Sequence, residues 1–310
     1  MKLQIKNHAK IFILISASIL LLALLLSVFG LGINYGLDFT GGLNIEYNMN
    51  AAFQQSDVET ALQNQGIKDF KVTTTGAAGT TLNIRIPQLN SQDEIQTLQG
   101  GLEAELLTKY PDMDVANATA SYVGPTAGAT LVKNAILSVV LASAMMLVYI
   151  ALRFDLYSGM AAVLGLLHDV LIMFSFMVLL RNFIQMNSSF IAAMLTIVGY
   201  SINNTIVIFD RIRENNRKAE FSKLPRAEVV NISIGQSLGR TINTTLTTLV
   251  TIVSLYVLGV PSIREFSLPI IIGILAGLYS ANLINGYVWA FLEEKSKARR
   301  KKAKLNTQKA

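Results

Sequence analysis

The chain contains no cysteine among its 310 residues, which excludes disulfide bonds and thiolate metal sites. Its two histidines, His8 and His168, are too few for the usual histidine-based zinc site. Charged residues make up 15% of the chain, whereas ordinary soluble domains contain about a quarter. We therefore expect no metal and no cofactor, and any chemistry at depth must use uncharged polar groups and a few isolated charges.

What the chain has instead is apolar sequence: 52% of residues are hydrophobic and the mean hydropathy is +0.45. A helix that spans a membrane needs about 20 mostly apolar residues. Six stretches qualify, namely Ile11–Gly30, Leu131–Leu152, Leu156–Leu180, Asn187–Phe209, Thr241–Val260 and Phe266–Leu292. The sequence predicts a polytopic α-helical membrane protein, divided into residues 1–33 (N-terminus and helix 1), 34–125 (a separate domain), 126–292 (helices 2–6) and 293–310 (a basic tail).

Lysine and arginine flank these spans on alternate sides. They are Lys2, Lys6, Lys10, Arg153, Arg211, Arg213, Arg217, Lys218, Lys223, Arg226 and most of residues 295–304. Because such residues are enriched in cytosolic loops, we expect both termini in the cytosol and residues 34–125 outside the cytoplasmic (inner) membrane. The tail is expected to contact anionic lipids rather than nucleic acid. A cleaved signal peptide is the alternative for residues 2–30, although the apolar run is longer than usual.

Residues 34–125 contain alternating strand and helix patterns. Strands are predicted at Leu43–Tyr47, Phe70–Thr75, Thr80–Ile86 and Asp114–Val123, with helices that begin in capping boxes at Ser56–Glu59 and Ser91–Glu94. The residues Gly76–Gly79 form the predicted turn of a hairpin. The order βαββαβ favours a ferredoxin-like α+β domain.

Polar residues inside the apolar runs are the candidate functional residues. Asn203 and Asn204 stand side by side in span 4, where an unpaired carboxamide is costly. Span 3 contains His168 and Asp169. Adjacent helical residues point about 100° apart, so we expect each to find its partner on another helix. A proton relay and a hydrogen-bonded clamp remain open for this pair.

Span 5 opens with Arg240 and a series of threonines that includes Thr244 and Thr248. Arg240 and Asn204 are expected at similar depth and could meet. Arg240 is then either a cation beside a polar path or an anchor at the membrane surface. Threonine hydroxyls also bond their own helix, so the series alone indicates little.

Glycines join span 1 to the separate domain in the segment Gly36-Leu37-Asp38-Phe39-Thr40-Gly41-Gly42. Such spacing permits a tight bend in which backbones approach closely. Asp38 could accept backbone N–H groups there. The segment is read as a structural elbow or as a part that handles substrate directly.

Seven segments taken together resemble the SecF branch of the SecD/SecF family of bacterial protein export, within the RND superfamily. They are Gly36–Gly42, Val123–Pro125, Arg153-Phe154, His168-Asp169, Gly199–Glu214, Ser233–Thr248 and Gly277–Ser280. The resemblance implies six spans with an outer domain between the first two. It also implies a SecD-like partner, the SecYEG channel, YidC and YajC as further partners, and a translocating preprotein moved with the proton-motive force.

The resemblance also assigns residues. Arg240 matches the arginine of the family's fifth span, whereas Asn204 stands where an aspartate is expected. Because a carboxamide cannot carry a proton as a carboxylate does, three alternatives are open: the SecD-like partner supplies the titrating carboxylate, Asp169 or Asp210 takes part, or coupling is weak or uses another ion such as Na⁺. The expected ion path comprises Asn203, Asn204, Arg240, Thr244, Thr248, His168 and Asp169; the motif residues are Gly36, Asp38, Gly41, Gly42, Gly199, Tyr200, Asp210, Arg211 and Arg213.

Two other functions fit parts of the sequence. Half of a small-molecule exporter of the RND type would need an apolar cleft in residues 34–125, a region that is small and polar. An intramembrane enzyme would need reactive groups that face each other at depth, and adjacent His168 and Asp169 are not expected to do so. We expect a protein that is not an enzyme.

Overall fold

The computed structural model describes residues 9–75, 79–87 and 92–307. Within this part the chain forms two compact units. One contains residues 9–34 and 137–307 and is called the helical unit; the other contains residues 35–136 and is called the sheet unit. The helical unit holds the polar residues that were expected at membrane depth.

Within the described residues, six helices are long and apolar enough to cross a membrane, as the sequence predicts. The long elements are α1 (Ala9–Val28), α5 (Pro125–Arg153), α6 (Leu156–Leu179), α7 (Ser188–Arg217), α8 (Arg226–Leu258) and α9 (Pro261–Ser280), which continues through the π-helical segment η3 (Ala281–Asn285) into α10 (Gly286–Thr307). Helix α8 starts 15 residues before the predicted span, because nothing between Arg226 and Thr241 breaks the helix.

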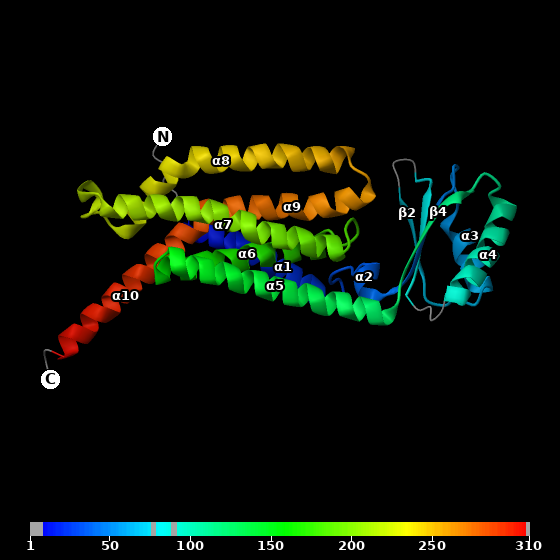
Figure 1. Ribbon diagram of the computed structural model, residues 1–310, viewed down its shortest axis with the longest axis horizontal. Helices are drawn as coiled ribbons and strands as arrows, with labels where there is room; N and C mark the ends of the chain where they lie inside the picture. Colours follow the sequence, from blue (N-terminus) through cyan, green and yellow to red (C-terminus); the bar gives the residue numbers. More distant parts are fainter. Residues whose placement is uncertain (1–8, 76–78, 88–91, 308–310) are drawn as a thin grey trace. The chain divides into compact units, whose positions relative to one another are not determined.

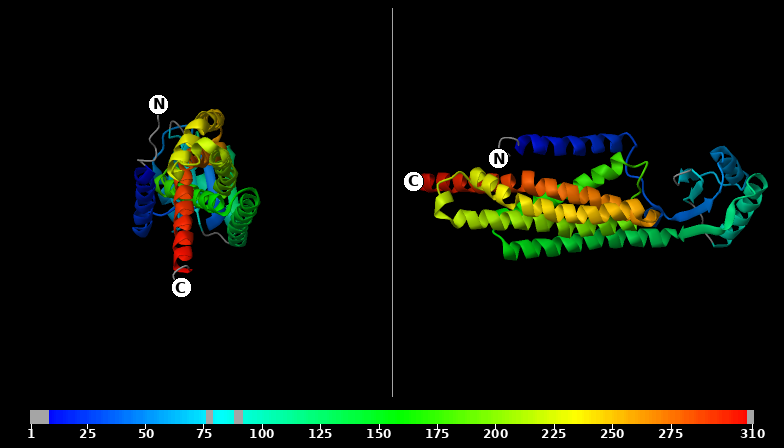
Figure 2. Two further views of the ribbon diagram at one scale, coloured as in Figure 1. Left: turned by 90° about the vertical axis from the view of Figure 1, so that its left-hand side faces the viewer. Right: turned by 90° about the horizontal axis from the view of Figure 1, so that it is seen from above.

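Helices α7 and α9 form the centre of the helical unit, with α6 and α8 packed against them (Figure 1). Helix α1 lies at one side of this group and packs against α6 (Figure 2). In the most apolar 18 residues of each span, half are buried in α6 and α7, but none in α5 and 11% in α8. The outer sides of α5 and α8 therefore face lipid or another protein.

The sheet unit contains four antiparallel strands in the order β2-β3-β1-β4. The strands are β1 (Gly42–Asn48), β2 (Lys71–Thr75), β3 (Thr81–Ile86) and β4 (Asp114–Val123), and the helices are α2 (Leu37–Thr40), α3 (Gln55–Asn64) and α4 (Gln92–Lys109). Helices α3 and α4 cover one face of the sheet (Figure 1). The predicted order of strands and helices is confirmed, although the turn residues 76–78 lie outside the described residues.

The capping box predicted at Ser56 is wrong. Helix α3 begins at Gln55, and Gln54 precedes it without a side-chain cap. Asp57 instead accepts hydrogen bonds from the Tyr110 hydroxyl at 2.7 Å and the Lys109 ammonium at 3.1 Å, beyond the end of α4 and at its last residue. These contacts, led by Tyr110, hold the pKa of Asp57 below its usual value. The side chain of Asp57 therefore joins α3 to the end of α4 instead of capping α3. The second predicted capping box begins at Ser91, which lies outside the described residues.

Candidate functional site

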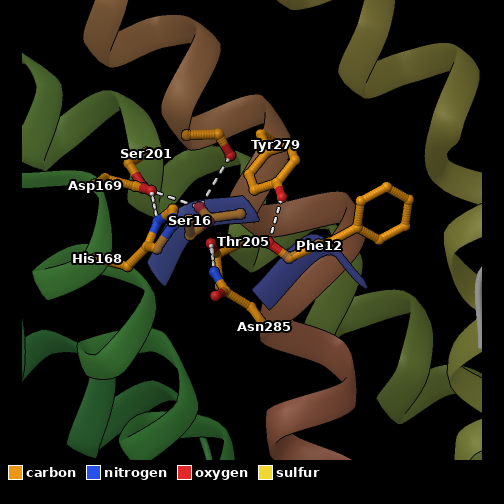
Figure 3. Close-up of polar contacts among 10 residues, drawn as sticks. Phe12, Ser16, His168, Asp169, Ser201, Thr205, Tyr279 and Asn285 are labelled. Carbon is orange, nitrogen blue, oxygen red and sulfur yellow. Dashed lines mark hydrogen bonds and ion pairs between the residues drawn. The ribbon is translucent and has the colours of Figure 1, made fainter. Parts of the chain in front are cut away.

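Asp169 lies at the centre of a polar cluster built by four helices. Its side chain is fully buried, and Figure 3 shows the groups that surround it. One carboxylate oxygen accepts hydrogen bonds from the hydroxyls of Ser201 on α7 and Ser280 on α9, the latter at 2.9 Å. The other lies 2.8 Å from Nδ1 of His168. Hydroxyl groups and an imidazole thus compensate for the loss of water around this carboxyl group.

His168 extends the cluster to α1. Its Nε2 lies 2.8 Å from the hydroxyl of Ser16, which is only 4% exposed. The ring also stacks on Tyr279, whose hydroxyl donates to the carbonyl of Phe12 at 2.6 Å (Figure 3). The prediction that each residue of the pair has a partner on another helix is confirmed.

The prediction that His168 and Asp169 do not face each other is wrong. Their Cα–Cβ bonds diverge by about 100° around the helix, but both side chains are long enough to turn toward each other. The result is a continuous series of hydroxyl, imidazole and carboxyl groups from Ser16 to Ser280.

A second polar level lies one turn away along the same helices. Thr205 follows Ser201 by four residues on α7 and accepts a hydrogen bond from Asn285 at 3.0 Å. Asn285 is five residues beyond Ser280, which in an α-helix would turn it about 140° to another face. The π-helical segment has i→i+5 geometry and returns Asn285 near the face of Ser280.

Gly165 completes this second level. It precedes Asp169 by four residues on α6, and a Cβ atom there would lie 2.3 Å from the carboxamide of Asn285. The carboxamide occupies the space that the missing side chain leaves. The Oδ1 atom of Asn285 is buried and has no hydrogen-bond partner within the described residues.

Asn204 is buried but does not contact Arg240. Its Nδ2 atom donates to the Thr245 hydroxyl on α8 at 3.4 Å, a long bond, and the side chain is 1% exposed. Thr241, one turn before Thr245, lies 3.3 Å from the carboxamide oxygen of Asn282. Arg240 is exposed. It is five residues from Thr245, so it points to another side of α8. The contact that was considered possible between Asn204 and Arg240 is therefore not formed, and Asn204 pairs with Thr245 instead.

The threonine series of α8 divides between two faces. Thr241 and Thr245 point into the helical unit. Thr244 and Thr248 bond carbonyl groups of the preceding turn. Tyr200 on α7 reaches both of them, with its hydroxyl 3.3 Å from the Thr244 carbonyl and 3.4 Å from the Thr248 hydroxyl. Exposed Arg240 and Thr244 thus share one side of α8 with partly buried Thr248.

The remaining motif residues lie at the surface or near the end of α7. Asn203 and Gly199 are exposed, as is Arg213. Asp210 pairs with Arg153 at the end of α5 at 3.2 Å, and both side chains are more than 40% exposed. Arg211 pairs with Glu214 at 2.7 Å within α7. These pairs join helix ends and lie apart from the buried cluster of Asp169.

The glycine elbow belongs to the sheet unit. Gly41 and Gly42 have φ values of +70° and +109°, which favour glycine, and a Cβ atom on Gly42 would lie 2.3 Å from the Ile86 carbonyl oxygen. Gly128 in α5 lies against this elbow: a Cβ there would be 3.4 Å from the Asp38 carbonyl oxygen and the Gly41 nitrogen. The elbow is therefore packed tightly against β3 and the start of α5; Gly36 is buried at its beginning.

The order Ser16, His168, Asp169 is also that of a serine hydrolase triad. A nucleophile needs room for a substrate and N–H donors for an oxyanion. Ser16 is 4% exposed and lies within α1, where the backbone N–H groups are used by the helix. Among the described residues, no group of three or more carboxylate or imidazole side chains could hold a metal ion. The arrangement is suited to holding or moving a proton rather than to attacking a substrate.

Comparison with known protein families shows to which family the chain belongs. The model of "Protein export membrane protein SecD/SecF, C-terminal" matches residues 103–295, and that of the "SecD/SecF GG Motif" matches residues 26–50. The chain belongs to the SecD/SecF family. The second match covers the glycine elbow, so the family motif includes the two glycines with positive φ.

Members of the SecD/SecF family resemble the chain over most of its length. The protein translocase subunit SecF of Haemophilus influenzae is 35% identical, over 86% of this chain and 79% of the relative. The protein translocase subunit SecDF of Bacillus subtilis is 32% identical over 93% of this chain, which corresponds to 38% of the longer relative. A crystal structure of SecDF from Thermus thermophilus aligns with a TM-score of 0.76 and 34% identity, over 93% of this chain and 38% of that one.

Sequence reasoning missed several residues of the buried cluster. Ser16, Ser201, Ser280 and Asn285 are small polar residues within the spans, and Ser201 and Ser280 belong to named segments without being singled out. A lone serine in a membrane helix commonly bonds its own backbone, so it carries little signal.

Proposed function

We propose that the chain is an accessory subunit of the Sec translocase that assists export of preproteins across the cytoplasmic membrane with the proton-motive force. The family membership and the translocase names of its relatives support the role in export. The observation that carries the proposed coupling is the buried carboxyl group of Asp169, held among four helices. Ionisable groups at membrane depth commonly mark ion pathways.

Asp169 is the proposed proton-binding group of this chain. Asn204 cannot bind a proton in this way, and Asp210 is engaged with Arg153 at a helix end. Protonation of Asp169 would remove the charge that the hydroxyls of Ser201 and Ser280 solvate. Packing of α6 against α7 and α9 would then change, which is a two-state element that a proton can bias.

A SecD-like protein is the proposed partner. The aligned region covers only 38% and 36% of two relatives named SecDF, which is consistent with both halves in one chain. The exposed side of α8 with Arg240 and Thr244 is the proposed contact surface. A guanidinium at this depth is costly in lipid, so a partner with acceptor groups would stabilise it. SecYEG, YidC, YajC and the preprotein are further proposed partners.

The sheet unit is the proposed outer domain, with a ferredoxin-like arrangement. The sheet order β2-β3-β1-β4 and the element order βαββαβ support this assignment. Both termini would lie in the cytosol, as the flanking lysines and arginines indicate. The elbow Gly36–Gly42 would transmit movement between the spans and the outer domain.

Depletion of the protein in its own cells tests the role in export. We expect secretory precursors to accumulate, because completion of translocation slows. Affinity purification of the full-length chain should recover a SecD-like protein. Unchanged precursor processing, together with altered drug susceptibility, would instead favour a small-molecule exporter.

A further inference from the structure

A polar cavity and an apolar cavity meet at one end of the helical unit. The polar cavity, of about 350 Å³, lies between the start of α6, the end of α7, the start of α8 and the first half of α10. The apolar cavity, of about 500 Å³, lies between α5 and α6 and is lined by side chains such as Leu147, Met160 and Val163. Asp155 lines both cavities. A polar pocket that continues into an apolar groove matches the division of a phospholipid into headgroup and acyl chain.

One wall of the polar cavity is aromatic. Trp289 on α10 lines the cavity and is 5% exposed. Its indole nitrogen is buried and has no hydrogen-bond partner within the described residues, so the ring forms a wall of the cavity and its N–H is not a contact for a ligand.

The charges of the polar cavity come in both signs. Arg226 and Lys297 supply two cations, and Glu293 and Asp155 supply two carboxylates. Glu293 lies 3.3 Å from the Arg226 guanidinium and 2.6 Å from the Lys297 ammonium. A purely anionic ligand would meet the carboxylates, whereas a zwitterion can place its phosphate near the cations and its ammonium near the acids.

We propose that this pair of cavities binds a phospholipid with a primary-amine headgroup, phosphatidylethanolamine in chemical class. Its phosphate contacts Arg226 and Lys297, its ammonium group contacts Glu293 and Asp155, and one acyl chain follows the groove between α5 and α6. In the orientation proposed above, this lipid belongs to the cytosolic leaflet. A trimethylated amine lacks N–H donors for the carboxylates, and phosphatidylglycerol lacks the amine altogether, so the site discriminates among these lipids.

Trp289 is the only tryptophan in the chain and serves as the reporter. The full-length protein is purified and its fluorescence is measured in mixed micelles that contain phospholipids with brominated acyl chains, which quench tryptophan on contact. Phosphatidylethanolamine, phosphatidylcholine and phosphatidylglycerol are compared at equal mole fraction. We expect phosphatidylethanolamine to associate about tenfold more strongly, as one charge-assisted hydrogen bond allows.

Matched variants identify the groups that make the difference. Glu293→Gln should remove the preference for the primary amine, whereas Glu294→Gln, on exposed Glu294 next to it, should retain it. Lys297→Gln should weaken association of all three lipids, and Lys295→Gln, which changes a lysine outside the cavity, should not. The emission maximum without brominated lipid shows whether each variant is folded around Trp289.

The wild-type comparison does not depend on any variant. Equal quenching by the three lipids would mean that the cavity does not select a primary-amine headgroup, and it would overturn the proposal. Stronger association of phosphatidylglycerol would also overturn it, because a site for anionic lipid needs no carboxylates.

Discussion

At the residue scale, the chain carries its buried carboxyl group on α6 instead of α7. Asn204 is buried with one long hydrogen bond to Thr245, whereas Asp169 has three close partners. Charges are tolerated at depth only when they are paired or hydrogen-bonded. Asp169 has the hydrogen bonds that a buried carboxylate requires. Asn204 has a single long hydrogen bond, which suits a neutral amide but not a charge.

Asn204→Asp tests whether the α7 position can serve as a second proton site. The variant places a carboxyl group near Thr245, and we expect it to make export more dependent on external pH, because a second group then binds and releases protons. Export kinetics across a pH series measure this change.

Asn203→Asp is the matched control, since Asn203 is exposed on the same helix. Its pH profile should remain that of the wild type. An unchanged profile for Asn204→Asp as well would argue against a coupling role for this part of α7.

At the element scale, the glycine elbow and the π-helical segment are two departures from regular geometry that position particular groups. The elbow needs positive φ values at Gly41 and Gly42 and leaves no room beside Ile86. The π segment aligns Asn285 with the level of Thr205. Both serve to bring particular groups together at the cost of regular hydrogen bonding.

Gly42→Ala should destabilise the sheet unit by about 1–3 kcal/mol from backbone strain, and further because the new methyl group overlaps the Ile86 carbonyl. Faster hydrogen exchange in β1 and β3 of the full-length protein would register this loss.

Gly66→Ala provides the comparison. Gly66 also has positive φ, at +80°, but nothing lies within 4 Å of its missing side chain. Gly66→Ala should therefore be destabilised by backbone strain alone, without the steric overlap expected for Gly42→Ala. If both variants exchanged equally fast, close packing at the elbow would not contribute.

The spans and strands were predictable because they depend on local pattern. Apolar runs of sufficient length gave six spans, and alternating residues gave the four strands. The contacts of the site depend on helix rotation and on irregular geometry. Thr241 and Thr245 turned inward while Arg240 stayed outside, and the π segment that positions Asn285 has no sequence signature in a single chain.

At the scale of the whole molecule, the helical unit has a buried centre and two exposed helices. The apolar cores of α6, α7 and α9 surround Asp169, while α5 and α8 bury little within the chain. We propose that another protein completes the subunit along these exposed helices. The proposed proton-binding centre and the proposed partner surface are thus on different helices, and movement of α7 and α9 would connect them, since α8 packs on both.

The most direct test is proton-driven translocation in membranes that contain the SecD-like partner, the Sec channel and either wild-type protein, Asp169→Asn or Asp210→Asn. Asp210 is the control because it forms an exposed ion pair with Arg153. We expect a protonophore to slow completion of translocation with the wild-type protein and Asp210→Asn. With Asp169→Asn the rate should already be low and should not respond to the protonophore. Full proton-driven stimulation with Asp169→Asn would contradict the account.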